Sequence, residues 1–421
     1  MPISGTLEAN QQSHMPSVHK LIIGMLLVTA VLGYVAGYEK LYAFHMVLMG
    51  YWVFVLTGFV KLRRQTSVIL FLPFLLFIFM AVSLLWSPSK LNGLYFLFYF
   101  FCGFSIIFSV INYAVDLNRL NFIFSILAFM FMLNFLVGLL ETTGLFRLPV
   151  SVYYGLDHTR PSGFNGNLNN FGFVFVAIFP FLFLHPSKSF NFFAVFLGIL
   201  FTIKLESKGF FLGVVFFFLI YALIEVRKKR FYVYFLTLFF FISPLLIFGY
   251  SNISSIELNT RSFTAIAEIN RGVQLIASAE IEGGGSTVKR ASFYLIGIQE
   301  LLSSNGFGVG IAGIGSILAA ESEHRIVSFH NFFLEMLVDF GILPFLIAFI
   351  SYLYIALKNI QSSRAIQNAS ISYYSKASGL SMLVMIPASI SPSSIIYIFT
   401  FWIVIGFSLA MYMINKKRNY N

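Results

Sequence analysis

The chain contains very little charge. Of its 421 residues only 10% are Asp, Glu, Lys or Arg, whereas 58% are hydrophobic and 54 are Phe. A soluble domain of this length cannot bury so much apolar surface, so the composition excludes a soluble globular protein and makes the lipid bilayer the main solvent. The apolar runs are long and do not alternate with polar residues, which favours membrane-spanning helices over the strands of a barrel.

Cysteine is nearly absent. The single residue Cys102 excludes an intramolecular disulfide and argues against a cysteine-based metal site. It lies within an apolar run, and we interpret it as a small buried hydrophobe. The net charge of +11 does not indicate nucleic-acid binding, because the basic residues cluster at predicted helix ends, as membrane topology requires. We therefore expect no nucleic-acid partner.

The apolar runs predict an all-α polytopic integral membrane protein with about 12 transmembrane helices. Residues 1–20 are polar and are expected to form a cytoplasmic tail rather than a cleaved signal. The first nine helices are expected within 21–250 and the last three within 330–413, before a short cytoplasmic tail at 414–421. The predicted spans are 21–38, 42–60, 67–86, 93–113, 120–140, 168–185, 190–204, 209–225, 231–250, 332–357, 376–391 and 394–413.

The short predicted loops carry most of their Lys and Arg on the side of both chain ends, which predicts that both termini are cytoplasmic. Two outer segments are then large, at 141–168 and at 251–329. Apolar residues at helical spacing predict an amphipathic surface helix over 266–276. Residues 291–302 predict a further helix. The glycines of 305–310 predict a flexible turn rather than a nucleotide-binding loop, because no strand precedes them.

Polar residues gather at the entrance of the sixth predicted span. Arg160 is a fixed cation, and the asparagines that follow supply amide donors and acceptors, a mixture that suits phosphate and sugar hydroxyls. The alternative interpretation is a turn followed by a helix cap, because Asn and Gly favour both. The asparagines are Asn165, Asn167, Asn169 and Asn170.

A second polar cluster is the tight outer turn at 204–209, which contains Lys208. Taken alone, this turn is also typical of a solvated loop with extended lysines. Its position between two predicted spans places it on the same outer side as Arg160. We therefore expect Lys208 to add positive charge to that side.

The third cluster ends the large outer loop and continues into the tenth predicted span. His330, Asn331 and Glu335 stand where a helix enters lipid. Polar and ionisable side chains are costly to place there, so their presence predicts a functional site. With an unperturbed pKa of about 6.5, His330 suits a general base, and the alternative is a histidine that caps the helix. Arg290 and Arg325 add positive charge to the same loop.

Cations and a base on the outer side of an apolar bundle point to a lipid that carries a diphosphate. Arginines neutralise the phosphates and the leaving group, a base takes the proton of an acceptor hydroxyl, and the bundle offers a groove for the lipid tail. No ATP is available outside the cell, so the donor arrives already activated and no cofactor is expected. A zinc site formed by His324, His330 and Glu321 or Glu323 lacks compact ligand spacing, and no metal is expected.

Several motifs follow one another in a fixed order. Arg160-Pro-Ser-Gly163 precedes the asparagine-rich stretch, Ser207-Lys208-Gly209 forms a turn, Arg290 stands three residues before Phe293, Asn305-Gly-Phe-Gly-Val-Gly310 follows, and His330-Asn331 is separated by nine residues from Gly341-Ile-Leu-Pro344. In this order the set resembles the O-antigen ligase and polymerase superfamily of bacterial envelope enzymes. Family ligases have arginine at the position of Lys208 and a second glycine at that of Pro344.

The resemblance implies a metal-independent membrane glycosyltransferase of the GT-C type with one large extracytoplasmic loop. Its donor would be an oligosaccharide on undecaprenyl diphosphate, used at the outer face of the bacterial cytoplasmic membrane. A polymerase transfers the growing glycan to the next lipid-linked repeat unit, and a ligase transfers it to lipid A-core or to a protein. Besides membrane lipid, a chain-length regulator and a flippase are the expected partners.

We expect a polysaccharide repeat-unit polymerase, with the ligase as the second possibility. His330 is expected to act as general base or to position the acceptor, and Arg160 and Arg290 are expected to grip the diphosphate. Further polar residues are expected to orient His330, to assist the arginines or to bind sugar hydroxyls. These residues are Lys208, Asn331, Glu335, Asn165, Asn169 and Arg325.

A transporter or flippase for a lipid-linked or amphiphilic substrate is the alternative of another class. About twelve spans fit it, but a transporter places ionisable residues deep within several spans and shows a repeat of hydropathy, which the chain lacks. A membrane scaffold is a third class, and it has no need of the pair His330 and Arg290. Tolerance of substitutions at these two residues would favour the scaffold.

Overall fold

The structure is a computed structural model that describes residues 4–38, 41–61, 63–155, 159–205, 207–225, 286–321 and 329–419. These residues are predominantly helical. The strands among them are two short segments, β1 (Gly37–Tyr38) and β2 (Leu41–Tyr42), which pair antiparallel. The predicted all-α class is therefore confirmed.

The helices follow the chain in two groups, before and after the segment 226–285. The first group is α1 (Ser4–Leu32), the 3₁₀ turn η1 (Gly33–Ala36), α2 (Ala43–Leu56), α3 (Arg64–Ser83), α4 (Lys90–Tyr113), α5 (Leu117–Thr142), the 3₁₀ turn η2 (Gly163–Asn165), α6 (Leu168–Phe183), α7 (Lys188–Lys204) and α8 (Lys208–Glu225). The second group is α11 (Ser286–Ser303), α12 (Gly313–Glu321), α13 (Phe332–Phe340), α14 (Ile342–Ala365), α15 (Ala369–Ala388) and α16 (Phe399–Asn419).

Capping side chains explain where several helices begin. Ser89, Asp116, Asn167, Asn331 and Asn368 precede α4, α5, α6, α13 and α15, and each accepts a hydrogen bond from a backbone N–H of the first turn. Such a bond satisfies one of the N–H groups that a helix leaves unpaired at its start. These helix starts are therefore determined by local sequence.

Five helices in the described part of the chain are long and apolar enough to cross a membrane, judged by length and composition: α4, α5, α8, α14 and most of α16. Shorter apolar helices are α2, α6 and parts of α1, α3 and α7. The chain is thus a helical membrane protein. The predicted span 231–250 and the predicted amphipathic helix over 266–276 lie outside the described residues.

The prediction of one continuous span over 332–357 is wrong. The chain breaks at Gly341, which has a φ of 81° and separates α13 from α14. A Cβ on Gly308 would lie 2.4 Å from the nitrogen of Gly341, so two backbone segments meet there with no room for a side chain. The glycines around Gly308 therefore form a docking segment against the break, where the sequence had predicted a flexible turn.

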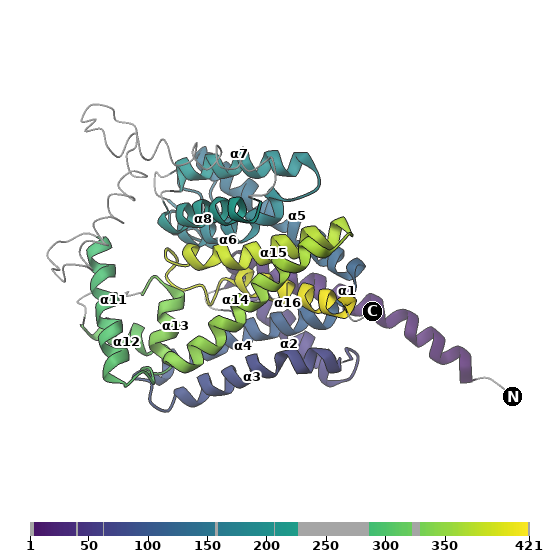
Figure 1. The fold of residues 1–421 in the computed structure, drawn as a ribbon, viewed down its shortest axis with the longest axis horizontal. Coiled ribbons are helices and arrows are strands. Elements are labelled where there is room, and N and C mark those ends of the chain that lie inside the picture. The colour runs from purple at the N-terminus through teal and green to yellow at the C-terminus, as the bar shows by residue number, and fades with distance from the viewer. Residues whose placement is uncertain are drawn as a thin grey trace.

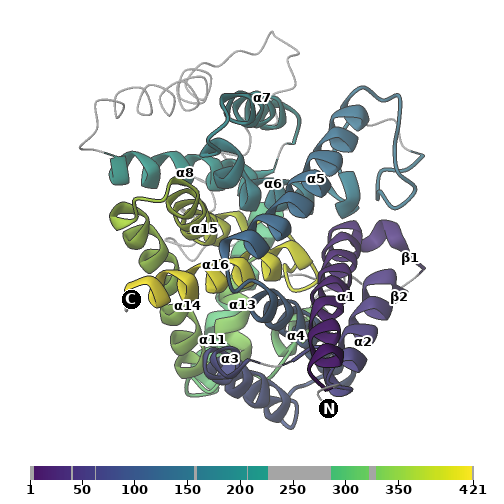
Figure 2. The ribbon, with the colours of Figure 1, turned by 90° about the vertical axis from the view of Figure 1, so that its right-hand side faces the viewer.

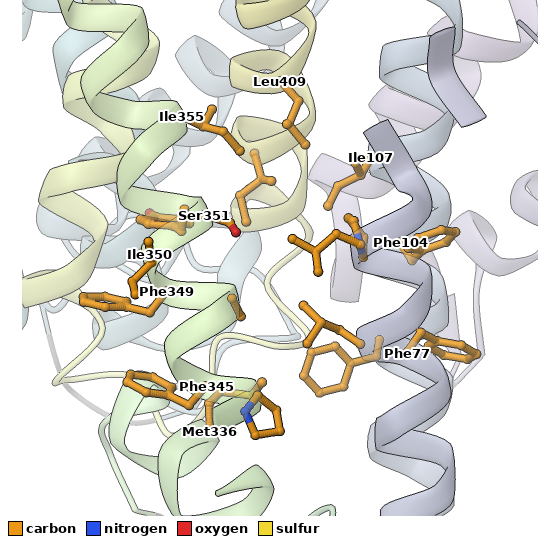
Figure 3. Close-up of a pocket in the computed structure, with 18 of the residues that line it drawn as sticks. Phe77, Phe104, Ile107, Met336, Phe345, Phe349, Ile350, Ser351, Ile355 and Leu409 are labelled. Carbon is orange, nitrogen blue, oxygen red and sulfur yellow. The ribbon is translucent and has the colours of Figure 1, made fainter. Parts of the chain in front are cut away.

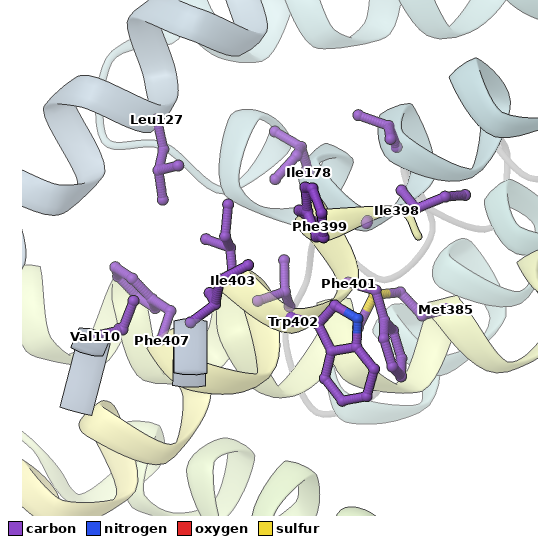
Figure 4. Packing of buried hydrophobic residues seen from close by; sticks show 14 of the residues in the cluster. Val110, Leu127, Ile178, Met385, Ile398, Phe399, Phe401, Trp402, Ile403 and Phe407 are labelled. Atoms are coloured by element: carbon purple, nitrogen blue, oxygen red, sulfur yellow. The ribbon is translucent and has the colours of Figure 1, made fainter. Parts of the chain in front are cut away.

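The helix α16 lies in the middle of the bundle (Figure 2), between α7 and α8 on one side and α1 to α3 on the other. Its side chains Phe401, Trp402 and Phe407 lie among residues of α4, α5, α6 and α15 (Figure 4). Gly103 of α4 makes this close crossing possible, because a Cβ there would lie 2.2 Å from the Trp402 ring. Lipid tails are as apolar as these side chains, so close van der Waals packing stabilises the bundle more than water exclusion does.

The bundle has two different ends (Figure 1). The terminal end carries the start of α1 and the end of α16, and the distal end carries α11, α12 and α13. At the terminal end, Lys376 of α15 forms an ion pair with the buried Glu225 at the end of α8. Nearby, Arg364 of α14 donates a hydrogen bond to the carbonyl of Ile224, 3.2 Å away. These contacts fasten α8, α14 and α15 together.

Candidate functional site

Two of the three predicted polar clusters meet at the distal end on a residue that the sequence did not single out, Ser391. It lies in the serine loop, which we define as residues 389–398 between α15 and α16. The backbone N–H of Gly209 donates to Oγ of Ser391 over 2.6 Å, and Nδ1 of His330 lies 3.2 Å from the carbonyl oxygen of Ser391. The half-buried Lys208 precedes Gly209 at the start of α8. We call this group the distal site.

The contact with Ser391 defines the protonation of His330. A carbonyl oxygen only accepts hydrogen bonds, so Nδ1 carries the proton in this contact, and the backbone of Pro392 is a second hydrogen-bond partner of the ring. Burial, helped by the positive charge of Arg290, lowers the pKa of His330 to about 4. The imidazole is therefore neutral at physiological pH. Its backbone has a φ of 52°, an uncommon value for a residue with a side chain and one often found at functional sites.

Helix α11 brings Arg290 and Tyr294 to His330. The two residues are four positions apart and so lie on the same face of the helix. The hydroxyl of Tyr294 donates to the carbonyl oxygen of His330 over 3.3 Å, and its ring packs on Phe329 with centroids 5.2 Å apart. This brings together the predicted pair of Arg290 and His330, with Tyr294 as a support that the sequence did not indicate.

Asn331 and Glu335 have different positions. Asn331 caps α13, and its Oδ1 accepts from the backbone N–H of Leu334 over 3.2 Å. Glu335 is buried one turn further on, with the hydroxyl of Ser394 and the carboxyl of Asp339 as its neighbours. Its Oε2 has no hydrogen-bond partner among the described residues. A buried carboxyl oxygen without a partner is costly, which is a reason to retain Glu335 as a candidate.

The Arg160 cluster is built on α5. The buried carboxylate of Glu141 accepts from the backbone N–H groups of Ser162 and Gly163, at 2.5 and 2.8 Å. The guanidinium of Arg160 lies 5.9 Å from the centre of the Tyr153 ring, and that of Arg147 lies 5.6 Å from the same ring. Tyr153 thus holds two arginines at the distal end, and the sequence had indicated only one of them.

The asparagines of this cluster serve the fold to different degrees. Oδ1 of Asn165 accepts from Nδ2 of Asn134 over 3.2 Å, and Asn167 caps α6 through the N–H of Asn170 at 2.9 Å. Nδ2 of Asn170 donates to the carbonyl of Asn165 over 3.4 Å. These contacts match the turn-and-cap interpretation. Asn169 is half-buried in the first turn of α6 and stays a predicted sugar ligand.

The starts of α6 and α8 connect the Arg160 cluster to the distal site. A Cβ on Gly172 of α6 would lie 3.0 Å from Cβ of Phe210 and 3.5 Å from Oγ of Ser207, so the two helix starts touch. Gly209 then reaches Ser391, and Ser391 reaches His330. The three predicted clusters therefore lie at one end of the bundle in a continuous line of contacts. Arg325 and His324 lie outside the described residues.

An apolar cavity of about 510 Å³ begins beside the distal site. Figure 3 shows Phe345, Phe349 and Ile355 of α14 on one wall and Phe77 and Phe104 on the other. The helix α13 starts directly after His330 and Asn331, and its side chains line the same cavity. Those side chains are Phe332, Phe333, Met336 and Phe340. The distal site thus lies at the start of a short helix whose side chains line the apolar cavity.

In the part of the chain that the structure describes, no three His, Cys, Asp or Glu residues lie together as metal ligands would. No family model matches the chain, and no curated protein matches it either. A functional assignment therefore rests on the residues and their geometry.

Proposed function

We propose that the protein is a membrane glycosyltransferase that polymerises polysaccharide repeat units carried on undecaprenyl diphosphate. The observation that supports this most is the position of His330, with Arg290 and the Lys208 turn on its polar side and an apolar cavity along α13. Such a site matches a substrate with an anionic head and a long apolar tail. The resemblance to the O-antigen ligase and polymerase superfamily adds to the proposal.

The reaction would form one glycosidic bond and break one. The hydroxyl of the acceptor sugar attacks the anomeric carbon of the donor glycan, the bond from that carbon to the phosphate oxygen breaks, and undecaprenyl diphosphate leaves with the electron pair. The neutral imidazole of His330 would take up the hydroxyl proton on its unprotonated ring nitrogen. Arg290, Arg160 and Lys208 would neutralise the charge that develops on the leaving diphosphate.

The topology belongs to the same proposal. The distal end faces outward, both termini are cytoplasmic, and about twelve spans of a GT-C-like fold cross the bacterial cytoplasmic membrane. The basic residues at the terminal end support this orientation, because Lys416, Lys417 and Arg418 end α16 there. On this orientation the distal site reaches lipid-linked glycans after they have been carried to the outer leaflet.

The test is complementation of a deletion of the gene in its native host. His330→Ala and Arg290→Ala should fail to restore long glycan, whereas Gln299→Ala, an exposed residue on the same helix as Arg290, should restore it. All three proteins must insert in equal amounts. Normal polymer length in either of the first two variants would refute the assignment.

The glycans of the deletion strain separate the related activities on one gel. Single repeat units on their normal anchor support the polymerase. Full-length polymer left on undecaprenyl diphosphate, with none on the final acceptor, would instead identify a ligase. Unchanged surface glycans would remove both and bring forward a transporter.

A further inference from the structure

The terminal end of the bundle contains a second pocket, of about 290 Å³, away from the distal site. It lies where the turn between α4 and α5 meets the start of α15 and the end of α16. Lys417 and Arg418 line it from α16, and both side chains are exposed to the surroundings. The proposed function has no use for this pocket, so a ligand there would be a separate property of the protein.

The pocket has an excess of positive charge. Asp116 is the acidic residue in its lining, and its carboxylate is already engaged by Arg119. One carboxylate oxygen accepts from the backbone N–H of Arg119 at 2.9 Å, and the other lies 3.4 Å from Nε of the same residue. The charges of Lys417 and Arg418 are therefore not neutralised by Asp116. An anion would be attracted to this pocket.

One helix start adds to this attraction. Asp116 caps α5 and Asn368 caps α15, and both caps line the pocket. The carboxylate of Asp116 already compensates the positive end of α5, whereas Asn368 is neutral, so α15, with 20 residues, brings the positive end of a long row of peptide dipoles to the pocket. Backbone N–H groups at such positions commonly bind phosphate groups. The side chains and the start of α15 thus favour the same kind of ligand.

The rest of the lining is apolar. Leu117, Ile371 and Ile414 face the pocket, and Ile371 and Ile414 are buried in the bundle. A soluble anion gains nothing from apolar walls, whereas a phospholipid presents a phosphate with glycerol and acyl carbons directly attached. Basic pockets between helices on the cytoplasmic side of membrane proteins bind anionic lipid headgroups. We propose that this pocket binds the phosphate headgroup of an anionic phospholipid.

The experiment uses the full chain purified in neutral detergent. One sample receives phosphatidylglycerol in mixed micelles, a second receives phosphatidylcholine in mixed micelles, and a third receives inorganic phosphate without lipid. The midpoint of thermal unfolding is compared among the three. Phosphatidylglycerol should raise the midpoint in a concentration-dependent way, and the other two additions should not. The double variant Lys417→Glu with Arg418→Glu should bind phosphatidylglycerol at least about 30-fold more weakly, because each basic residue near a lipid surface contributes roughly a factor of five to the affinity and each glutamate adds repulsion.

Two further variants make the result specific. Lys416→Glu changes an exposed charge next to the pocket that does not line it, so this variant should keep most of the wild-type response, whereas the double variant should lose it. Val115→Trp fills the pocket and leaves both cations in place, and it should lose the response. Equal responses of Lys416→Glu and the double variant, or no response of the wild type, would overturn the proposal. A response to inorganic phosphate as large as that to the lipid would assign the pocket to a soluble anion instead.

Discussion

The backbone nitrogen of Gly209 lies 2.6 Å from Oγ of Ser391, and this contact fastens the start of α8 to the loop that supports His330. A Cβ on Gly209 would lie 2.5 Å from the carbonyl oxygen of Ala388 and 2.9 Å from Oγ of Ser391. Only glycine therefore allows this approach. The middle position of the predicted Ser207-Lys208-Gly209 turn carries the charge, and the last position provides the fit.

We expect Gly209→Ala to lower the free energy of unfolding by about 1–3 kcal/mol, because the added methyl group meets backbone that cannot move without cost. Gly315→Ala is the matched control, since a Cβ at Gly315 of α12 meets nothing within 4 Å. That change should be neutral or should stabilise the helix by about 0.5–1 kcal/mol. Thermal unfolding of both variants in detergent measures the difference. Equal stability of the two variants would contradict the close contact.

His330 should make the stability depend on pH in a defined window. Its folded pKa is about 4, against about 6.5 for an unfolded histidine. Between these values the unfolded chain binds a proton that the folded chain does not, so stability falls as the pH falls from about 6.5 to about 4 and is unaffected above 6.5. The loss is about 3 kcal/mol over the whole window.

The matched variant for this test is His330→Asn, because Asn tolerates the positive φ of this position. Between pH 6.5 and pH 4, the unfolding free energy of the variant should fall by about 3 kcal/mol less than that of the wild type. The variant should also lose glycosyl transfer, since the amide cannot take up a proton. Parallel pH curves for the two proteins would show that His330 is not held neutral.

Arg290 should have two separable effects. Its positive charge helps to lower the pKa of His330, so Arg290→Ala should raise that pKa and narrow the pH range over which protonation of His330 lowers the stability. Arg290→Lys keeps the charge and should leave this pH range unchanged. Transfer by the lysine variant should still fall, by about 100-fold, because an ammonium group cannot hold a phosphate through two parallel hydrogen bonds. Full activity of Arg290→Lys would argue against a bidentate contact.

The apolar cavity should set the affinity for the lipid donor. Ala348 of α14 lines it, and Ala348→Trp would reduce its volume. We expect KM for a lipid-linked donor to rise about tenfold with kcat unchanged, which is the pattern of lost ground-state binding. Leu346→Trp places the same ring on an exposed position of the same helix that does not line the cavity, and its KM should stay that of the wild type. A similar rise in both variants would point to a general effect on α14.

The helices could be predicted from sequence because each depends on its own apolar run and caps. The predicted span 93–113 lies within α4 (Lys90–Tyr113), and the predicted helix 291–302 lies within α11. The break at Gly341 could not be predicted, because it depends on the close approach of Gly308 from a distant part of the chain.

The candidate site shows the same division. His330, Arg290 and Lys208 were accessible as charged or titratable residues in an apolar chain. Ser391 could not be identified from sequence, because nothing distinguishes a serine that contacts two distant segments from any other serine in a polar loop. Asn134 and Glu141 did give a signal, as polar residues within the apolar run of α5, and they organise the Arg160 cluster.

The start of α8 is fastened through Gly209 to Ser391 in the serine loop that follows α15, and the end of α8 is fastened through Glu225 to Lys376 of α15. Because α8 is joined to α15 and its following loop at both ends, we expect these helices to move as one rigid unit. If the proposed function is correct, the lipid tail is expected to be accommodated by the other wall of the cavity, where α3 and α14 face each other. The imidazole of His330, which contacts the serine loop through Ser391, is then expected to keep its position when the cavity is filled.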